Sequence, residues 1–235
     1  HSDLAIQAAM PAGLLSFALV CLFTAIAGYS STFVSQYHGA KEEANSVHAA
    51  AQGLIFMLLS TPVLLLMIPL GSRMFAWFGH APDLVAQEIV YFEWMIYGAL
   101  PMGLNWTLAG YFTGRGKVHL ATAANIVGCV ANVALDYAMI FGRFGFPEMG
   151  LRGAAVATCA SSALTTAILL AAMLRSAPVR ALGLRRAFVF QRDLMRRLLY
   201  FGYPAGVQIL LDVGAFSVFV LMTARLEPAV LTVAN

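Results

Sequence analysis

Charge is scarce in this sequence. Only 11% of the 235 residues are Asp, Glu, Lys or Arg, whereas 60% are hydrophobic, and the mean hydropathy is +0.79. Soluble domains carry about 25% charged residues, so this composition excludes an ordinary soluble fold. The net charge of +3 is too small to indicate a nucleic-acid-binding surface. We therefore expect an integral membrane protein, with the lipid bilayer and no nucleic acid among its partners.

Cysteine pairs and catalytic motifs are also missing. Cys21, Cys129 and Cys159 lie within apolar runs and form no CxxC pair, which argues against a disulfide framework or a cysteine-ligated metal. The apolar stretches contain no HExxH or GxSxG, and "TGRGKVH" (113–119) lacks the first glycine of a phosphate-binding loop. The sequence therefore predicts neither an enzyme nor a cofactor.

Long stretches without Asp, Glu, Lys or Arg are present instead, at 4–40, 44–72, 94–114, 118–135 and 153–174. A sixth stretch is apolar except for Asp212. A membrane-spanning helix needs ~20 mostly apolar residues. The sequence therefore predicts an all-α, polytopic membrane helix bundle with six spans, at 10–37, 50–78, 89–112, 119–141, 151–174 and 198–224.

Lys and Arg are distributed unevenly between the two sides that these spans define. Ten lie on one side and four on the other, and the richer side is cytoplasmic by the positive-inside rule. The N-terminus is then outside and the basic loop 175–197 is cytoplasmic. We interpret that loop as a topology signal, and an interfacial amphipathic helix in "FQRDLMRRLL" (190–199) is the alternative.

The two ends of the chain resemble each other weakly. "SDLAIQAAM" (2–10) and "EPAVLTVAN" (227–235) share a pattern of Leu, Ala and small residues, and the chain begins with His1 without a visible signal peptide. We expect a piece of a longer, duplicated protein. Six helices per repeat is an even number, so the halves would share one orientation and be related by an axis along the membrane normal.

Three stretches carry a more specific pattern: "VSQYHGAKEEANSV" (34–47), "NVALDYAMIFGRFGFPEMGLRGAAVAT" (132–158) and "FGYPAGVQILLDVGAFSVF" (201–219). With the order and loop lengths of the spans, they resemble the multidrug and toxic compound extrusion (MATE) family of efflux transporters. The resemblance implies twelve helices in two pseudo-symmetric six-helix lobes. It also implies a protein of the bacterial inner (plasma) membrane that is monomeric when full length.

The resemblance divides the chain into three parts. Residues 1–174 correspond to N-lobe helices two to six, with the first helix lying before His1. Residues 175–197 correspond to the cytoplasmic loop between the lobes. Residues 198–235 correspond to the first helix of the C-lobe, and helices eight to twelve would follow Asn235.

Two carboxylates fall inside predicted spans. Asp136 shares a helix face with Asn132, four residues earlier, and Asp212 lies near the centre of the sixth span. A carboxylate in a membrane is costly unless it is paired, protonated or facing a cavity. Asp136 is only about 7–8 Å from its span's end, so water contact is the alternative there, and a packing hydrogen bond is the alternative for Asp212. By resemblance, Asp136, Asn132 and Asp212 are the proton- or cation-coupling residues, and Na⁺ at either Asp is the one metal we consider.

Neutral polar residues within the spans are weaker candidates. Possible cavity-lining residues are Gln36, Tyr37, Thr158 and Gln208, and further polar positions are Gln52, Asn105, Asn125 and Asn235. Hydrogen bonds between membrane helices are worth under ~2 kcal/mol, so a role in tying helices together is favoured for each amide. Tyr37 could also stack on a lipophilic cation.

The leading hypothesis is a cation-coupled (H⁺ or Na⁺) antiporter that exports lipophilic, often cationic, drugs or toxic metabolites by alternating access. The alternative is a lipid-linked oligosaccharide flippase of similar helical architecture. A flippase should carry basic residues inside its spans to meet a pyrophosphate, and the charge-free stretches contain none. A purely structural membrane scaffold would not need Asp212 in mid-membrane.

Overall fold

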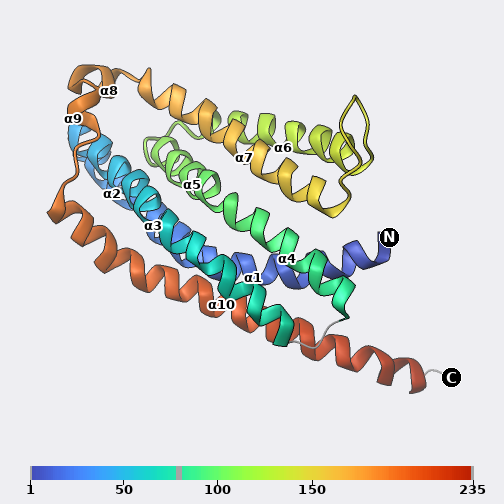
Figure 1. The fold of residues 1–235 in the computed structure, drawn as a ribbon. Helices are drawn as coiled ribbons and strands as arrows, with labels where there is room; N and C mark the ends of the chain where they lie inside the picture. Colours follow the sequence, from blue (N-terminus) through green and yellow to red (C-terminus); the bar gives the residue numbers. More distant parts are fainter. Residues whose placement is uncertain (1, 78–80, 234–235) are drawn as a thin grey trace.

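The computed structural model describes the backbone of residues 2–77 and 81–233, and the side chains of residues 8–9, 12–75 and 81–215. Within those ranges all regular structure is helical, which confirms the all-α prediction (Figure 1). The helices are α1 (Ser2–Gly28), α2 (Ser30–Gly39), α3 (Glu43–Trp77), α4 (Pro82–Tyr97), α5 (Ala99–Gly114), α6 (Val118–Ile140), α7 (Leu151–Leu174), α8 (Ala177–Leu182), α9 (Leu184–Ala187) and α10 (Arg192–Val233).

Five helical segments of the described chain are long and apolar enough to cross a membrane: Ala12–Gly39, Glu43–Phe75, Val118–Ile140, Leu151–Leu174 and Arg192–Ala215. They correspond to five of the six predicted spans. The predicted span 89–112 differs, because the chain breaks at Gly98 into α4 and α5, each of 16 residues. Pro101 explains the break, since it has no N–H to bond the carbonyl of Tyr97 one turn earlier.

The break at Gly98 is braced by α7. The Cys159 thiol donates to the Trp94 carbonyl (3.0 Å), and the Thr166 hydroxyl donates to the Pro101 carbonyl (2.7 Å). A Cβ atom at Gly98 would lie 2.6 Å from the Cys159 Sγ atom, so only glycine fits there. The Trp94 carbonyl also accepts from the Gly98 N–H (2.9 Å). The helix α7 thereby adds one hydrogen bond to a carbonyl group on each side of the break.

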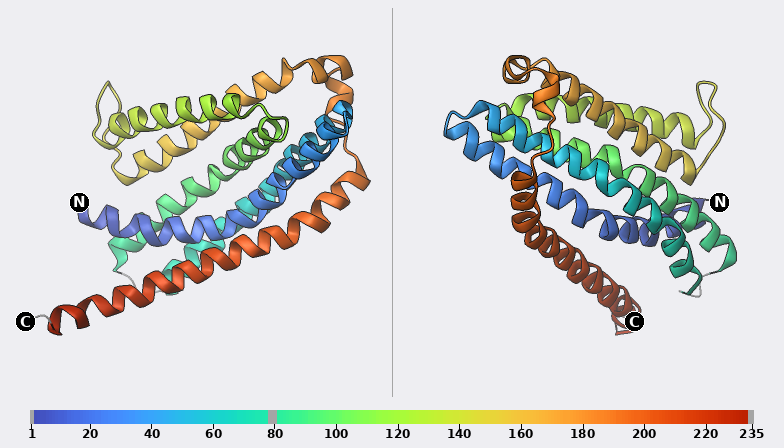
Figure 2. Two further views of the ribbon diagram at one scale, coloured as in Figure 1. Left: turned by 180° about the vertical axis from the view of Figure 1, so that it is seen from behind. Right: turned by 60° about the vertical axis from the view of Figure 1, so that its left-hand side comes forward.

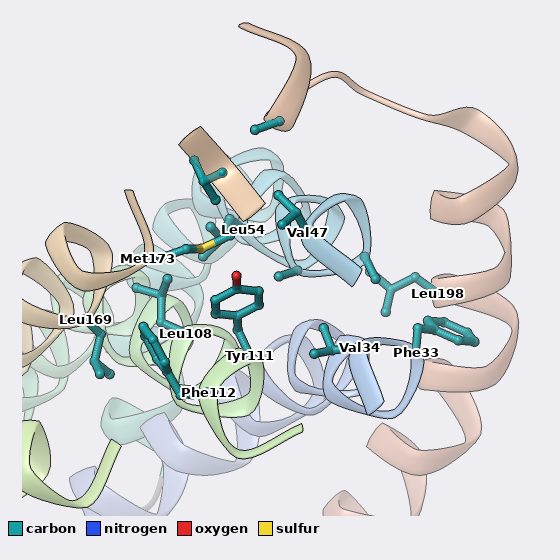
Figure 3. Packing of buried hydrophobic residues seen from close by; sticks show 14 of the residues in the cluster. Phe33, Val34, Val47, Leu54, Leu108, Tyr111, Phe112, Leu169, Met173 and Leu198 are labelled. Atoms are coloured by element: carbon teal, nitrogen blue, oxygen red, sulfur yellow. The ribbon is translucent and has the colours of Figure 1, made fainter. Parts of the chain in front are cut away.

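The helices stack in layers across the molecule. The hairpin of α6 and α7 lies on one side, α4 and α5 lie next to it, then α1 to α3, and α10 lies on the opposite side (Figure 2). The largest buried cluster joins α2, α3, α5, α7 and α10, with Tyr111, Leu54, Met173 and Leu198 among its members (Figure 3). Close packing of α6 on α7 depends on Gly128, because any Cβ there would clash with the Thr165 hydroxyl.

A close seam joins α10 to α1 and α2. A Cβ atom at Gly202 would lie 3.1 Å from the Ile26 Cα atom, and one at Gly206 would lie 3.0 Å from the Leu22 carbonyl oxygen. This is the small-xxx-small spacing that lets membrane helices approach closely. The ring of Phe201 stacks on that of Tyr29, with centroids 6.4 Å apart and planes 11° apart.

The helix α10 begins at Arg192, six residues before the predicted start of its span. The segment 192–199 is therefore the first part of this long helix, and the described backbone shows no separate interfacial helix in 190–199. The assignment of residues to two lobes stays a prediction.

Candidate transport cavity and polar stripe

A cavity of about 640 Å³ lies between α1, α2, α5, α6 and α10. Its wall is made of small residues, hydroxyl groups, two asparagines and two aromatic rings: Ala25, Gly28, Tyr29, Ser31, Thr32, Asn105, Trp106, Ala109, Gly110, Thr113, Asn125, Ala205 and Ile209. No Asp, Glu, Lys or Arg belongs to this wall as far as the chain is described. Such a wall suits an aromatic or apolar compound that also makes a few hydrogen bonds.

Two asparagines meet in the cavity wall. The Asn105 side-chain amide of α5 donates to the Asn125 Oδ1 atom of α6 at 3.3 Å. The Asn105 Oδ1 atom is itself buried and accepts no hydrogen bond from the described residues. The pair therefore ties α5 to α6 and leaves one buried amide oxygen without a hydrogen bond from the described residues.

A polar stripe runs along one face of α6 and consists of Asn125, Asn132 and Asp136. The spacings of seven and four residues place all three side chains on the same face of the helix. The Asn132 Nδ2 and Asp136 Oδ1 atoms are buried, and neither has a hydrogen-bond partner among the described residues. Buried polar atoms are normally satisfied, so this end of the stripe has binding capacity for a proton, a cation or another polar group.

Sequence reasoning did not single out Tyr91 of α4, which is within electrostatic range of Asp136 in the folded chain. Tyr91 and Asp136 are 45 residues apart and lie on different helices, α4 and α6, so no local signal could identify Tyr91. Asn125 is also a member of the stripe, and its spacing from Asn132 and Asp136 is a signal present in the sequence.

Asp212 lies on α10 with an exposed side chain. It shares a helix face with Ala205 and Ile209, which line the cavity, because the three positions are separated by four and three residues. Asp212 therefore lies about one turn further along the cavity-facing side of α10. The described contacts do not bring Asp212 and Asp136 together.

The four possible cavity-lining residues take other positions in the described chain. Gln36 and Gln208 are exposed, Thr158 bonds the Ala154 carbonyl in its own helix (3.0 Å), and the Tyr37 hydroxyl accepts from Arg197 Nη1 (3.0 Å). None of them belongs to the wall of the 640 Å³ cavity. Asn235 lies outside the described residues.

Gln52 ties separate segments together. Its Nε2 atom donates to the Val189 carbonyl (3.0 Å), and its Oε1 atom accepts from the Gln191 N–H (3.1 Å). Gln52 is fully buried. The amide thus fixes the chain between α9 and α10 to α3.

The fold and the cavity define a polytopic helical membrane protein with a 640 Å³ cavity, one wall of which is a helix that also carries the half-buried Asp136. An acid on a membrane helix and a cavity between such helices are both features of secondary transporters. Residues 5–138 match the MatE family model. The chain belongs to the MatE family, and the family resemblance found in the sequence is confirmed. Members of this family are transporters and not enzymes.

Two curated relatives illustrate the match. A "Probable multidrug resistance protein NorM" of Deinococcus radiodurans is 32% identical over 209 residues, which cover 86% of this chain and 44% of the relative. A "Multidrug resistance protein NorM" of Photobacterium profundum is 26% identical over 174 residues, which cover 74% of this chain and 38% of the relative. The chain therefore spans less than half the length of these relatives.

Solved structures share the fold. The inward-facing conformation of a multidrug resistance MATE family transporter of the MOP superfamily superimposes with a TM-score of 0.75 at 25% identity, covering 91% of this chain and 47% of that one. The outward-facing conformation of such a transporter gives 0.71 at 22% identity, covering 86% and 44%. The helical order of the chain is thus that of roughly half a MATE transporter.

Proposed function

We propose that the complete protein exports lipophilic, often cationic, compounds in exchange for H⁺ or Na⁺ by alternating access. The observation that carries this proposal is the polar stripe of α6, whose Asn132 and Asp136 have buried, unpartnered atoms. The same stripe reaches the cavity wall at Asn125. An ion bound at one end of a rigid helix face can thereby influence a compound bound at the other.

In this proposal the ion and the exported compound prefer different conformations. Coupling requires only that difference in affinity between states, not direct competition at one site. A proton or Na⁺ on Asp136 neutralises a carboxylate that is otherwise costly to keep within the membrane. The Asn132 amide, one turn away, can turn its oxygen toward a cation or its N–H toward the carboxylate.

Asp212 is the second proposed coupling residue. It lies one turn beyond Ile209 on α10, whereas Asp136 lies on α6 beyond Asn125, so the two carboxylates are carried by different helices that line the cavity. A change in the separation of α6 and α10 would then alter how far the two carboxylates are exposed to water.

The cavity wall also bears on the flippase alternative. A lipid carrying a pyrophosphate would be expected to meet Lys or Arg side chains, and the described wall has none. The ring of Trp106 and the ring of Tyr29 instead offer faces on which an aromatic or cationic compound can stack. We therefore favour export of lipophilic compounds.

The test uses the full-length protein in proteoliposomes loaded with a fluorescent lipophilic cation, under an imposed proton or sodium gradient. Asp136→Asn and Asp212→Asn preserve shape and remove the titratable charge. We expect each to reduce gradient-driven export at least tenfold while substrate binding persists. The matched control is Asp193→Asn, an exposed acid outside the cavity. Unchanged export by both variants under both gradients would contradict the coupling assignment.

A further inference from the structure

The chain between α7 and α10 is strongly basic. Residues 175–197 contain seven arginines and a single acid, Asp193. The structure shows that much of this segment is folded, since it includes α8 and α9. We call residues 175–196 the basic linker.

The basic linker is held firmly against the rest of the molecule. Val179 and Ala187 are buried in the largest hydrophobic cluster, and the buried Gln52 amide bonds the linker backbone at Val189 and Gln191. These contacts hold it at the end of the bundle where α2 turns into α3, opposite the loop that joins α6 to α7 (Figure 1). The linker therefore presents a defined surface.

That surface combines free positive charge with exposed apolar side chains. Six arginines of the linker are exposed, and none of them forms an ion pair with a described side chain: Arg175, Arg180, Arg185, Arg186, Arg192 and Arg196. Leu184 and Phe190, which lie among them in the sequence, are 59% and 52% exposed. The neighbouring Arg197 is different, because it bonds Tyr37 and lies over the Phe33 ring at 5.1 Å.

We propose that the basic linker binds the headgroups of anionic phospholipids on the cytoplasmic face of the membrane. The guanidinium group is planar and matches a phosphate with two parallel hydrogen bonds. Arginines directly beside a membrane-spanning helix attract anionic lipids, and the membrane-spanning helix α10 starts within the linker, at Arg192.

The exposed apolar side chains favour lipid over a soluble anion as the occupant. Segments that lie in the membrane interface place basic groups among the headgroups and apolar groups at the acyl boundary. In the basic linker Arg185 and Arg186 supply the charge, and Leu184 and Phe190 supply the apolar contact. A free phosphate would use only the first pair. The lipid surface is thus the single occupant that accounts for both kinds of side chain.

The test measures which lipids stay bound to the full-length protein. The protein is reconstituted in nanodiscs of phosphatidylcholine with a minor fraction of phosphatidylglycerol, and retained lipids are counted by native mass spectrometry after transfer to detergent. We expect severalfold enrichment of phosphatidylglycerol, lost in the triple variant Arg180→Gln, Arg185→Gln, Arg186→Gln. The matched control, Arg73→Gln, Arg143→Gln, Arg152→Gln, removes the same charge from the other face and should keep the enrichment.

A second variant separates lipid from other occupants. Leu184→Ser with Phe190→Ser keeps every charge and should also lower phosphatidylglycerol retention. The proposal is overturned if the arginine variant keeps the enrichment, or if the control loses it equally. It is also overturned if millimolar inorganic phosphate displaces the lipid, because the surface is then a simple anion site. Absence of enrichment in the unaltered protein would point to an acidic protein partner instead.

Discussion

At the scale of single residues, Gln52 has a structural role that its residue type alone does not indicate. Gln52 is a buried amide in a membrane protein, and a residue of this kind is a natural candidate for ligand binding. The structure instead shows both ends of the amide on the backbone of the basic linker. Its side chain thus makes two hydrogen bonds from α3 to the backbone of the linker.

We expect Gln52→Leu to destabilise the full-length protein by about 2 kcal/mol, because it removes the hydrogen bonds of the buried amide to the Val189 carbonyl and from the Gln191 N–H. Thermal unfolding in detergent, followed by the loss of monodisperse protein, measures this change. Gln36→Leu is the matched control, since Gln36 is exposed. Equal midpoints for the two variants would show that the Gln52 hydrogen bonds contribute little.

Thr166 provides a second residue-scale prediction. Thr166→Val keeps the shape of the side chain but removes the hydrogen bond to the Pro101 carbonyl. We expect a loss of about 1 kcal/mol, within the range for hydrogen bonds between membrane helices. Thr113→Val, which removes only a bond to the Gly110 carbonyl of its own helix, should cost less in the same unfolding assay. A larger loss from Thr113→Val would reverse our ranking.

The sequence could predict polar residues of interest but not their partners. Asn132 and Asp136 were identifiable because helical spacing is a local property. Tyr37 was placed among possible cavity-lining residues, whereas its hydroxyl meets Arg197, 160 residues later. Asn105 and Asn125 meet only after α5 and α6 have packed together. A contact between two helices depends on how they are rotated relative to each other. The periodicity of the sequence does not determine that rotation.

At the scale of helices, the α1–α10 seam depends on two glycines. We expect Gly202→Val to push α10 away from α1, because a Cβ atom would already lie 3.1 Å from the Ile26 Cα atom and the two methyl groups of valine need more space. Gly39→Val is the control, since a Cβ there meets nothing within 4 Å. Disulfide cross-linking between Tyr29→Cys and Phe201→Cys measures the separation and should slow markedly only with Gly202→Val. An unchanged rate of disulfide formation would mean that the contact between α1 and α10 accommodates the valine side chain.

Element boundaries were predictable where apolar length decided them. The five long spans were found from the absence of charge alone. The break at Gly98 was not predicted, although Gly98 and Pro101 were both visible in the sequence. Proline inside a membrane helix is tolerated in many settings, so the local signal does not say whether a helix bends, breaks or continues. Here Cys159 and Thr166, which bond carbonyls on either side of the break, come from a neighbouring helix that the local sequence does not reveal.

At the scale of the whole molecule, three hydrogen bonds align α4 and α5 with α7 and with Ser176, two residues beyond its end. They join Trp94 to Cys159, Pro101 to Thr166 and Tyr111 to Ser176, and each pair is separated by 65 residues. Because the sequence separation is the same for all three pairs, the segment of α4 and α5 runs in the same direction as α7, with a constant offset of 65 residues.

We expect one alanine inserted after Ser162 to prevent accumulation of folded full-length protein. The insertion turns the rest of α7 by about 100°, so Thr166 and Ser176 lose their partners. One alanine inserted after Gly145 should be tolerated, since it falls in the exposed connection between α6 and α7. The yield of monodisperse protein by size exclusion compares them. Equal yields would show that register matters little.

The shared register has a consequence for spectroscopic measurement of motion. The helices α4, α5 and α7 cannot rotate past one another without losing three hydrogen bonds at once, and α6 is packed on α7 at Gly128. Spin labels on exposed positions of α5 and α7 should therefore report one narrow, unchanging distance throughout a transport cycle. A label pair across the cavity, on α6 and α10, should report the broad or double distribution of a moving wall.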